Sequence, residues 1–127
     1  MHYLLDTNII LEILLDQKRA EEAKQFIVSN IGNLYLSDFS LHSIGLHLFR
    51  KGLQKTFTNF AVDFLSTISI SVLPTQSYYS IEIKSKELGL DFDDTYQYLT
   101  AKDNSLCLVT FDNDFKPLVE AEAVIIL

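Results

Sequence analysis

The stretch LLDTNII, residues 4–10, places an aspartate between two apolar runs. The first run, HYLLD at residues 2–6, is almost continuously apolar, as buried strands of parallel sheets tend to be. From Thr7 onward the apolar residues recur at helical spacing, with Ile9, Ile10, Ile13 and Leu14 on one face. Asp6 therefore lies at the end of an expected strand and at the start of an expected helix. Its carboxylate is expected either to cap that helix or to be held at a functional site.

The rest of the chain alternates between expected strands and expected helices. The further strands are residues 33–37 (NLYLS), 70–74 (ISVLP), 105–110 (SLCLVT) and 123–127 (AVIIL). The further helices are residues 19–28, with its charges outward, a helix capped by Ser37 or Asp38, and residues 57–68, 76–88 and 93–102. This order predicts an α/β fold, a three-layer sandwich with a mostly parallel central sheet flanked by helices. With no repeat or linker, residues 1–127 are expected to form a single domain.

Composition limits the function classes. The 127 residues are 48% hydrophobic and carry a net charge of −7, which argues against a protein that grips nucleic acid through a broad basic surface. It does not exclude a protein whose acids first bind cations. Cys107 is the one cysteine, so no internal disulfide or structural zinc is expected, and its apolar neighbours indicate a core residue. No apolar run is long enough for a membrane span and no basic leader is visible, so a cytoplasmic protein is expected.

Two acidic clusters stand out beyond Asp6. The first, DFDDTYQYLTA at residues 91–101, crowds acids at a helix start, where Asp91 most simply caps the helix and complements its dipole. Asp94 differs, because it shares one side of the helix with Gln97 and is partly covered by apolar neighbours. Asp94 is therefore the acid of this cluster that we expect to face a cleft.

The second cluster, LVTFDNDF at residues 108–115, follows a buried strand. Turn formation alone would explain either Asp112 or Asp114, but it would not explain Asp6 at the end of another strand. In open α/β sheets, ligands bind outside the carboxyl ends of the strands. Asp6, Asp94 and Asp112 are thus expected to meet there, as oxygen ligands for a hard cation such as Mg²⁺.

LLDTNIILEIL, LYLSDFSLHSIGLHL and DFDDTYQYLTAKDNSLCLVTFDNDF together resemble the PIN domain, the nuclease fold of VapC-type toxins and of several RNA-processing enzymes. The resemblance spans nearly the whole chain, and its D-T-N opening and T-x-D-x-D-F tail are specific in combination. It implies an endoribonuclease that uses Mg²⁺ or Mn²⁺ and leaves 5′-phosphate and 3′-hydroxyl ends. The matching metal ligands are Asp6, Asp94 and Asp112, and Asp114 is the fourth catalytic acid.

Three further positions are compared with the family pattern. Asn8 matches the polar residue of the opening motif, and Thr110 matches the Thr or Ser before the last acids. Ser43 departs from the pattern, because it stands where the family usually has a glutamate. A serine there could still hold a metal-bound water. His47, one turn beyond Ser43, shares its face, but imidazole suits softer ions than Mg²⁺ and a histidine more often packs or caps.

Two hypotheses remain open for function. The first is the nuclease, with Arg50, Lys51 or Lys55 touching RNA phosphates, although a solvated helix end explains these cations at least as well. The second, prompted by Ser43, is a PIN-like module that binds RNA or a protein partner without cutting. The resemblance also implies a homodimer and, for a toxin, an antitoxin in an apolar groove lined by the first helices and by residues 57–64.

Overall fold

The computed structural model of the chain describes residues 1–121 and 123–127. Its centre is a five-stranded sheet in the order β3-β2-β1-β4-β5, in which every pairing is parallel. The strands are β1 (Tyr3–Leu5), β2 (Leu34–Ser37), β3 (Ser69–Ser71), β4 (Cys107–Thr110) and β5 (Val124–Ile126). The sheet confirms the α/β prediction. Cys107 is buried in β4.

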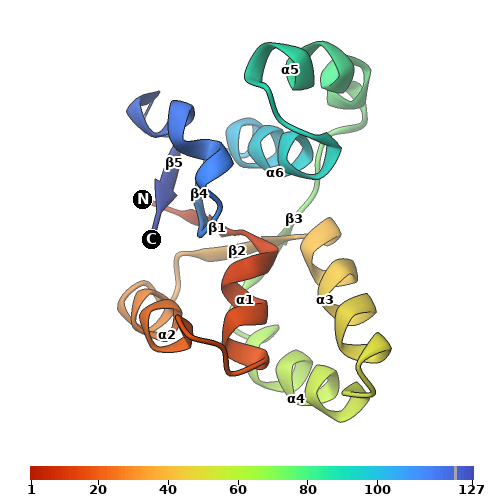
Figure 1. The fold of residues 1–127 in the computed structure, drawn as a ribbon, viewed down its shortest axis with the longest axis vertical. Helices are drawn as coiled ribbons and strands as arrows, with labels where there is room; N and C mark the ends of the chain where they lie inside the picture. The colour runs from red at the N-terminus through yellow and green to blue at the C-terminus, as the bar shows by residue number, and fades with distance from the viewer. Residues whose placement is uncertain (122) are drawn as a thin grey trace.

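Helices cover both faces of the sheet, which gives the expected three layers (Figure 1). One face packs against α1 (Thr7–Leu14), α2 (Ala20–Ser29), α3 (Asp38–Arg50) and α4 (Gln54–Phe64). The other packs against α5 (Ile81–Leu88), α6 (Phe92–Asp103) and the 3-10 helix η2 (Asn113–Ala121). A second 3-10 helix, η1 (Thr75–Ser80), leads into α5. Within the described ranges, no helix combines the length and apolar character that a membrane span requires.

Side-chain caps fix the starts of the three helices that matter for the site. Asp6 accepts a hydrogen bond from the Thr7 backbone N–H and caps α1. Ser37, the first of the two predicted candidates, caps α3. Asp91 caps α6, as its position at the helix start predicted. Each cap satisfies a backbone donor that the helix cannot satisfy itself, so the entry point of each helix is defined.

The register of the sheet brings two sequence-distant segments together. β1 pairs with β4 so that Leu5 lies opposite Val109. Asp6 and Thr110 follow these partners, and the Asp6 backbone N–H donates to the Val109 carbonyl at 2.8 Å. The segments that carry Asp6 and Asp112 consequently leave the sheet side by side at its carboxyl edge.

Some element boundaries differ from the predictions. The helix expected at residues 57–68 begins at Gln54 and ends at Phe64, while Phe60 is buried as its spacing indicated. The helix expected at residues 76–88 is split into η1 and α5. In η1 the Ser80 hydroxyl donates to the Ser77 carbonyl at 3.0 Å, a side-chain bond that competes with regular helix bonds. Gly89, in the left-handed conformation with φ 67°, ends α5.

The third strand is also shorter than expected. It spans Ser69–Ser71 instead of residues 70–74. Its only described partner, β2, ends at Ser37, which lies opposite Ser71. The hydrogen-bond ladder therefore ends before the apolar residues that suggested a longer strand.

Candidate functional site

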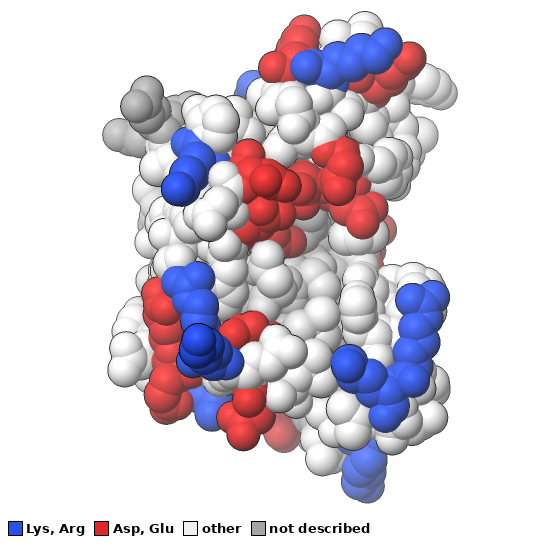
Figure 2. Space-filling view, in the orientation of Figure 1, with Lys and Arg blue, Asp and Glu red and all other residues white. Residues whose placement is uncertain are grey.

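A polar pocket of about 250 Å³ opens at the carboxyl edge of the sheet. Its walls come from the end of β1 and from α1, α3, α6 and the segment after β4. The lining residues are Asp6, Thr7, Asn8, Leu11, Phe39, Ser43, His47, Asp93, Asp94, Gln97 and Asp112. Figure 2 shows acidic side chains gathered in a hollow near the centre of one face of the molecule. We call Asp6 and its hydrogen-bond partners Gln97 and Thr110 the floor, and the carboxylate group of Asp94, Asp112 and Asp114 the mouth, although Thr110 and Asp114 do not themselves line the pocket.

Asp6 forms the floor and accepts four hydrogen bonds. Its Oδ1 accepts from the Thr7 backbone N–H at 2.8 Å and from Gln97 Nε2 at 3.1 Å. Its Oδ2 accepts from Thr110 Oγ1 at 2.7 Å and from Asn8 Nδ2 at 3.4 Å. Asp6 is thus a helix cap, and it also lines the pocket.

The pKa of Asp6 reflects two opposing influences. Burial raises the pKa above its ordinary value of 3.8, and the negative charge of Asp112 adds to that effect. Hydrogen bonds from Thr110, Gln97 and Thr7 act in the other direction, because they stabilise the carboxylate. Burial is the largest of these influences, so the pKa stays raised.

Gln97 connects the floor to α3 and was not recognised as a site residue from the sequence. Its Nε2 donates to Asp6 and also to Ser40 Oγ at 2.8 Å, and its Oε1 accepts from Ser37 Oγ at 2.6 Å. Ser40 Oγ lies 2.9 Å from Thr7 Oγ1. The one available signal was the position of Gln97 one turn after Asp94 on the same helix side.

Asn8 and Thr110 connect the floor to the segment that carries Asp112. The Thr110 hydroxyl donates to Asp6 and accepts from the Asp112 backbone N–H at 2.9 Å. Asn8 Oδ1 accepts from the Phe111 backbone N–H at 3.2 Å. Both residues therefore lie where the sequence placed supporting groups, in contact with the acids or with their backbone.

The mouth brings three carboxylates together. One oxygen each from Asp94, Asp112 and Asp114 lies within 4.8 Å of the other two. Asp112 Oδ1 also accepts from the Asp114 backbone N–H at 2.9 Å, which shapes the turn after β4. Asp6 lies deeper, with 7% of its surface exposed, and is not a member of this group.

The charge of the mouth is costly in the metal-free protein. The pKa of Asp94 is raised from 3.8 to about 7, chiefly by burial and then by Asp91, Asp112, Asp6 and Asp114. Half-buried carboxylates at such separations destabilise one another's charged forms. An oxygen-only donor set with this excess of negative charge fits a hard divalent cation such as Mg²⁺ or Mn²⁺.

Ser43 and His47 both line the same pocket from α3. Ser43 is half-buried and His47 is exposed. Ser43, where the resemblance to the PIN domain implies a glutamate, thus offers a hydroxyl to the pocket that Asp6, Asp94 and Asp112 line. Asp93, from the first turn of α6, is a further lining acid that the sequence reasoning left unassigned.

Other predicted contact residues lie outside this pocket. Arg50 and Lys51, at the end of α3, are exposed and are not among its lining residues. An apolar groove of about 470 Å³ is present, but α3 supplies most of its wall, with one residue from α4 and one from β3. Its apolar lining residues are Leu41, Leu46, Phe49, Phe57 and Ile70, so α1 and α2 do not line it.

Comparison with known proteins places this arrangement in context. The PIN domain family model matches residues 3–120. A toxin–antitoxin complex from Klebsiella pneumoniae superposes with a TM-score of 0.76 at 23% identity, covering 97% of this chain and 95% of that one. VapC20 from Mycobacterium tuberculosis, described as a sarcin-ricin loop cleaving toxin, gives 0.74 at 14% identity, over 91% and 94%. FitAcB from Neisseria gonorrhoeae gives 0.73 at 24%, over 98% and 96%. A search of curated proteins by sequence found no match.

Proposed function

The chain belongs to the PIN domain family, whose model covers residues 3–120, and we propose that it is a metal-dependent endoribonuclease and the toxin of a toxin–antitoxin pair. One observation carries the nuclease proposal. Three carboxylates converge within 4.8 Å of one another, and two of them, Asp94 and Asp112, line the same polar pocket as Asp6. This convergence raises the pKa of Asp94, and no lysine or arginine is among the residues that line the pocket.

Mg²⁺ or Mn²⁺ would be held by Asp94 and Asp112, together with Asp114 and with Asp6 from the floor. Bound there, the ion would lower the pKa of an attacking water and neutralise charge that develops on the phosphate. The protein supplies orientation. Gln97 and Thr110 hold the Asp6 carboxylate through hydrogen bonds of 3.1 and 2.7 Å, and Thr110 also fixes the Asp112 backbone.

The toxin assignment draws on the structural neighbours, several of which are toxin–antitoxin complexes. We propose that a small antitoxin protein binds this chain and that RNA is the substrate. At sequence identities of 14 to 24%, these neighbours support the fold alone. The RNA target is therefore to be identified by direct measurement.

Cleavage of single-stranded RNA by chelator-treated protein tests the nuclease proposal. Activity should be absent in EDTA and should return on addition of Mg²⁺ or Mn²⁺. Asp112→Asn should lower the rate by about 100-fold or more, since it removes one direct anionic ligand. Asp63→Asn removes the same charge from an exposed position on α4 and should leave the rate unchanged. Activity that persists in EDTA, or that survives Asp112→Asn, would refute the proposal.

Ser43 favours a second candidate function, a module that binds RNA or protein without cutting. The hydroxyl at this pocket position cannot supply the negative charge of the usual glutamate. If the purified protein is inactive with either ion and Ser43→Glu restores cleavage, the non-catalytic assignment replaces the first.

A further inference from the structure

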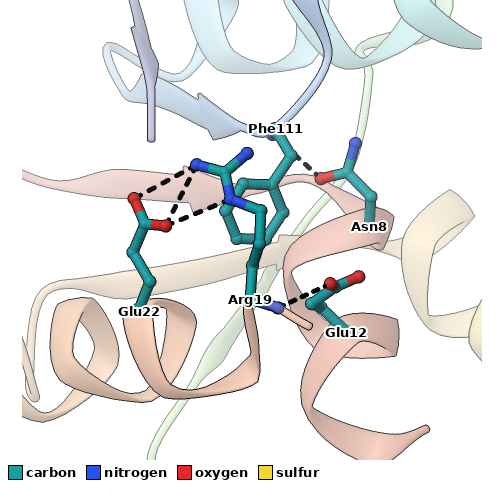
Figure 3. Close-up of polar contacts among 5 residues, drawn as sticks. All are labelled: Asn8, Glu12, Arg19, Glu22 and Phe111. Carbon is teal, nitrogen blue, oxygen red and sulfur yellow. Dashed lines mark hydrogen bonds and ion pairs between the residues drawn. The ribbon is translucent and has the colours of Figure 1, made fainter. Parts of the chain in front are cut away.

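Arg19 stacks on Phe111, the residue that directly precedes Asp112, although its position in the sequence gives no sign of this. Its guanidinium carbon is 4.1 Å from the centre of the Phe111 ring, and Phe111 directly precedes Asp112. The Phe111 backbone N–H is held by Asn8 from α1. Figure 3 shows the guanidinium lying over the ring, with Glu22 on its other side. A cation is thereby placed over the side chain of the residue that precedes a mouth carboxylate.

Glu22 accepts hydrogen bonds from two of the three guanidinium nitrogens of Arg19. Arg19 Nε and Nη2 donate to the two carboxylate oxygens of Glu22, each at 3.1 Å. Nη1 lies outside this pair. The arginine side chain keeps 40% of its surface exposed and that of Glu22 keeps 48%, so solvent or a ligand reaches both. The planar fork of a guanidinium suits a phosphate as well as it suits a carboxylate.

The preference of N-cap positions does not explain the choice of arginine at this position. Arg19 occupies the N-cap position of α2 and makes no side-chain capping bond there. Ser, Thr, Asp and Asn are preferred at an N-cap, and a cation is unfavourable at the positive end of a helix dipole. The stack on Phe111, which is far away in sequence, is the contact that distinguishes this arginine from Lys24, the cation within α2.

We propose that Arg19 binds a phosphate group of the RNA strand adjacent to the phosphate that enters the acidic mouth. Phe111 supports the guanidinium from one side, and Glu22 occupies its fork until the RNA phosphate displaces the carboxylate. The exchange is purely electrostatic and involves no covalent step. Arg19 would thereby supply a positive charge to an acidic protein where the RNA backbone has to approach the mouth carboxylates. The proposal rests on the proposed function, because it names the substrate contact of that same site.

RNA binding without cleavage tests this contact separately from nuclease activity. The parent for all measurements is Asp94→Asn in EDTA, which removes one mouth charge and prevents metal-dependent cleavage. Anisotropy of a fluorescein-labelled single-stranded RNA is measured from about 50 to about 200 mM salt, a range in which the loss of one phosphate contact lowers the slope of log affinity by about 0.7. Arg19→Asn should show this smaller slope and a dissociation constant raised about tenfold. Asparagine is a preferred N-cap, so α2 should remain stable in this variant.

Two further variants separate phosphate binding from a structural role. Glu22→Gln removes the competing carboxylate and should tighten RNA binding about threefold, whereas a structural ion pair predicts weaker binding. Arg19→Lys should retain the salt slope while losing part of the affinity, because the charge remains and the stacked fork is lost. Lys18→Asn removes a neighbouring exposed cation and is the matched control, expected to leave the slope unchanged.

Several outcomes would overturn the proposal. They are equal effects of Arg19→Asn and Lys18→Asn, no effect of Arg19→Asn, or weaker binding by Glu22→Gln. A parent protein that does not bind RNA would overturn it as well. Arg19-dependent binding by a protein that never cleaves RNA would support the contact while refuting the nuclease assignment, so the two failures are distinguishable.

Discussion

At the floor of the pocket Asp6 accepts four hydrogen bonds, whereas at the mouth Asp94 is surrounded by other carboxylates. Both acids have a raised pKa, and burial is the largest cause in both. They differ in the remaining causes, because hydrogen-bond donors oppose the rise at the floor and negative charges add to it at the mouth. Folding therefore disfavours the charged form of both acids, but hydrogen bonds offset part of that cost at the floor, whereas neighbouring charges increase it at the mouth.

The largest change in the free energy of unfolding should come from removing the floor carboxylate. Asp6→Ala leaves the buried donors of Gln97 and Thr110 without their acceptor, and it deletes the cap of α1. Urea unfolding in EDTA should show a loss of about 2–4 kcal/mol. Asp63→Ala, on the surface of α4, should change the free energy of unfolding by less than about 0.5 kcal/mol. Equal effects of the two substitutions would show that the floor has no structural role.

At the mouth the opposite sign is expected. The protonated form of Asp94 is favoured in the folded protein, so its stabilising contribution is fully present below about pH 3.8 and is lost as the pH rises through about 7. Asp94→Asn should therefore stabilise the metal-free protein at about pH 8, by about 1 kcal/mol after allowance for solvent screening, or about 4 °C in melting temperature. The effect should shrink as the pH falls below about 7, and it should nearly vanish only below about pH 3.8. Thermal melts that show destabilisation at the higher pH would contradict this assignment of the mouth.

Cation affinity should follow the same ionisation. Binding requires a deprotonated Asp94, whose pKa in the metal-free protein is about 7. Below that pH, Mn²⁺ affinity measured by calorimetry should fall by up to about tenfold for each pH unit. Asp94→Asn should bind Mn²⁺ weakly and with little dependence on pH in this range. A wild-type Mn²⁺ affinity that is constant from about pH 5 to 8 would show that Asp94 is not a ligand of the cation.

The smallest effect concerns the half-buried serine of the pocket wall. Ser43→Glu adds another carboxylate to the region of the mouth, so it should destabilise the metal-free protein by about 0.5 kcal/mol. The same change should tighten Mn²⁺ binding several-fold, since one more oxygen ligand becomes available. Ser66→Glu, in the turn after α4, is a control that should alter neither quantity. Tighter Mn²⁺ binding without a loss of stability in the metal-free state would show that the mouth charges do not act on a carboxylate at position 43.

The sequence predicted the sheet and the acids for the same physical reason. Buried parallel strands are continuous apolar runs, and the polar residues that follow them collect at one edge. This logic located Asp6 after β1 and Asp112 after β4, which the register then places side by side. Element ends were less predictable, as η1 shows, because serine side chains compete locally with the helix bonds.

The contacts that tune the site were not accessible to the same reasoning. Gln97 reaches Ser37 and Ser40, which are 60 and 57 residues away, and no periodic pattern records such a bond. Arg19 was expected only as an outward charge of its helix. The spacing to Glu22 is visible in the sequence, but the ring of Phe111 is brought beneath the guanidinium by tertiary packing alone.

The Thr110 hydroxyl has one hydrogen, and it donates this hydrogen in a bond to Asp6, which is 104 residues away in the sequence. Only lone pairs then remain for the amide of Asp112, which approaches at 2.9 Å. A neutral Asp6 could itself become the donor, which would free the hydroxyl to rotate. Thr110→Ser would keep the hydroxyl that bonds Asp6 and the Asp112 backbone, and Thr110→Val would remove it, so one hydroxyl joins the residue after the first strand to the acids that follow β4.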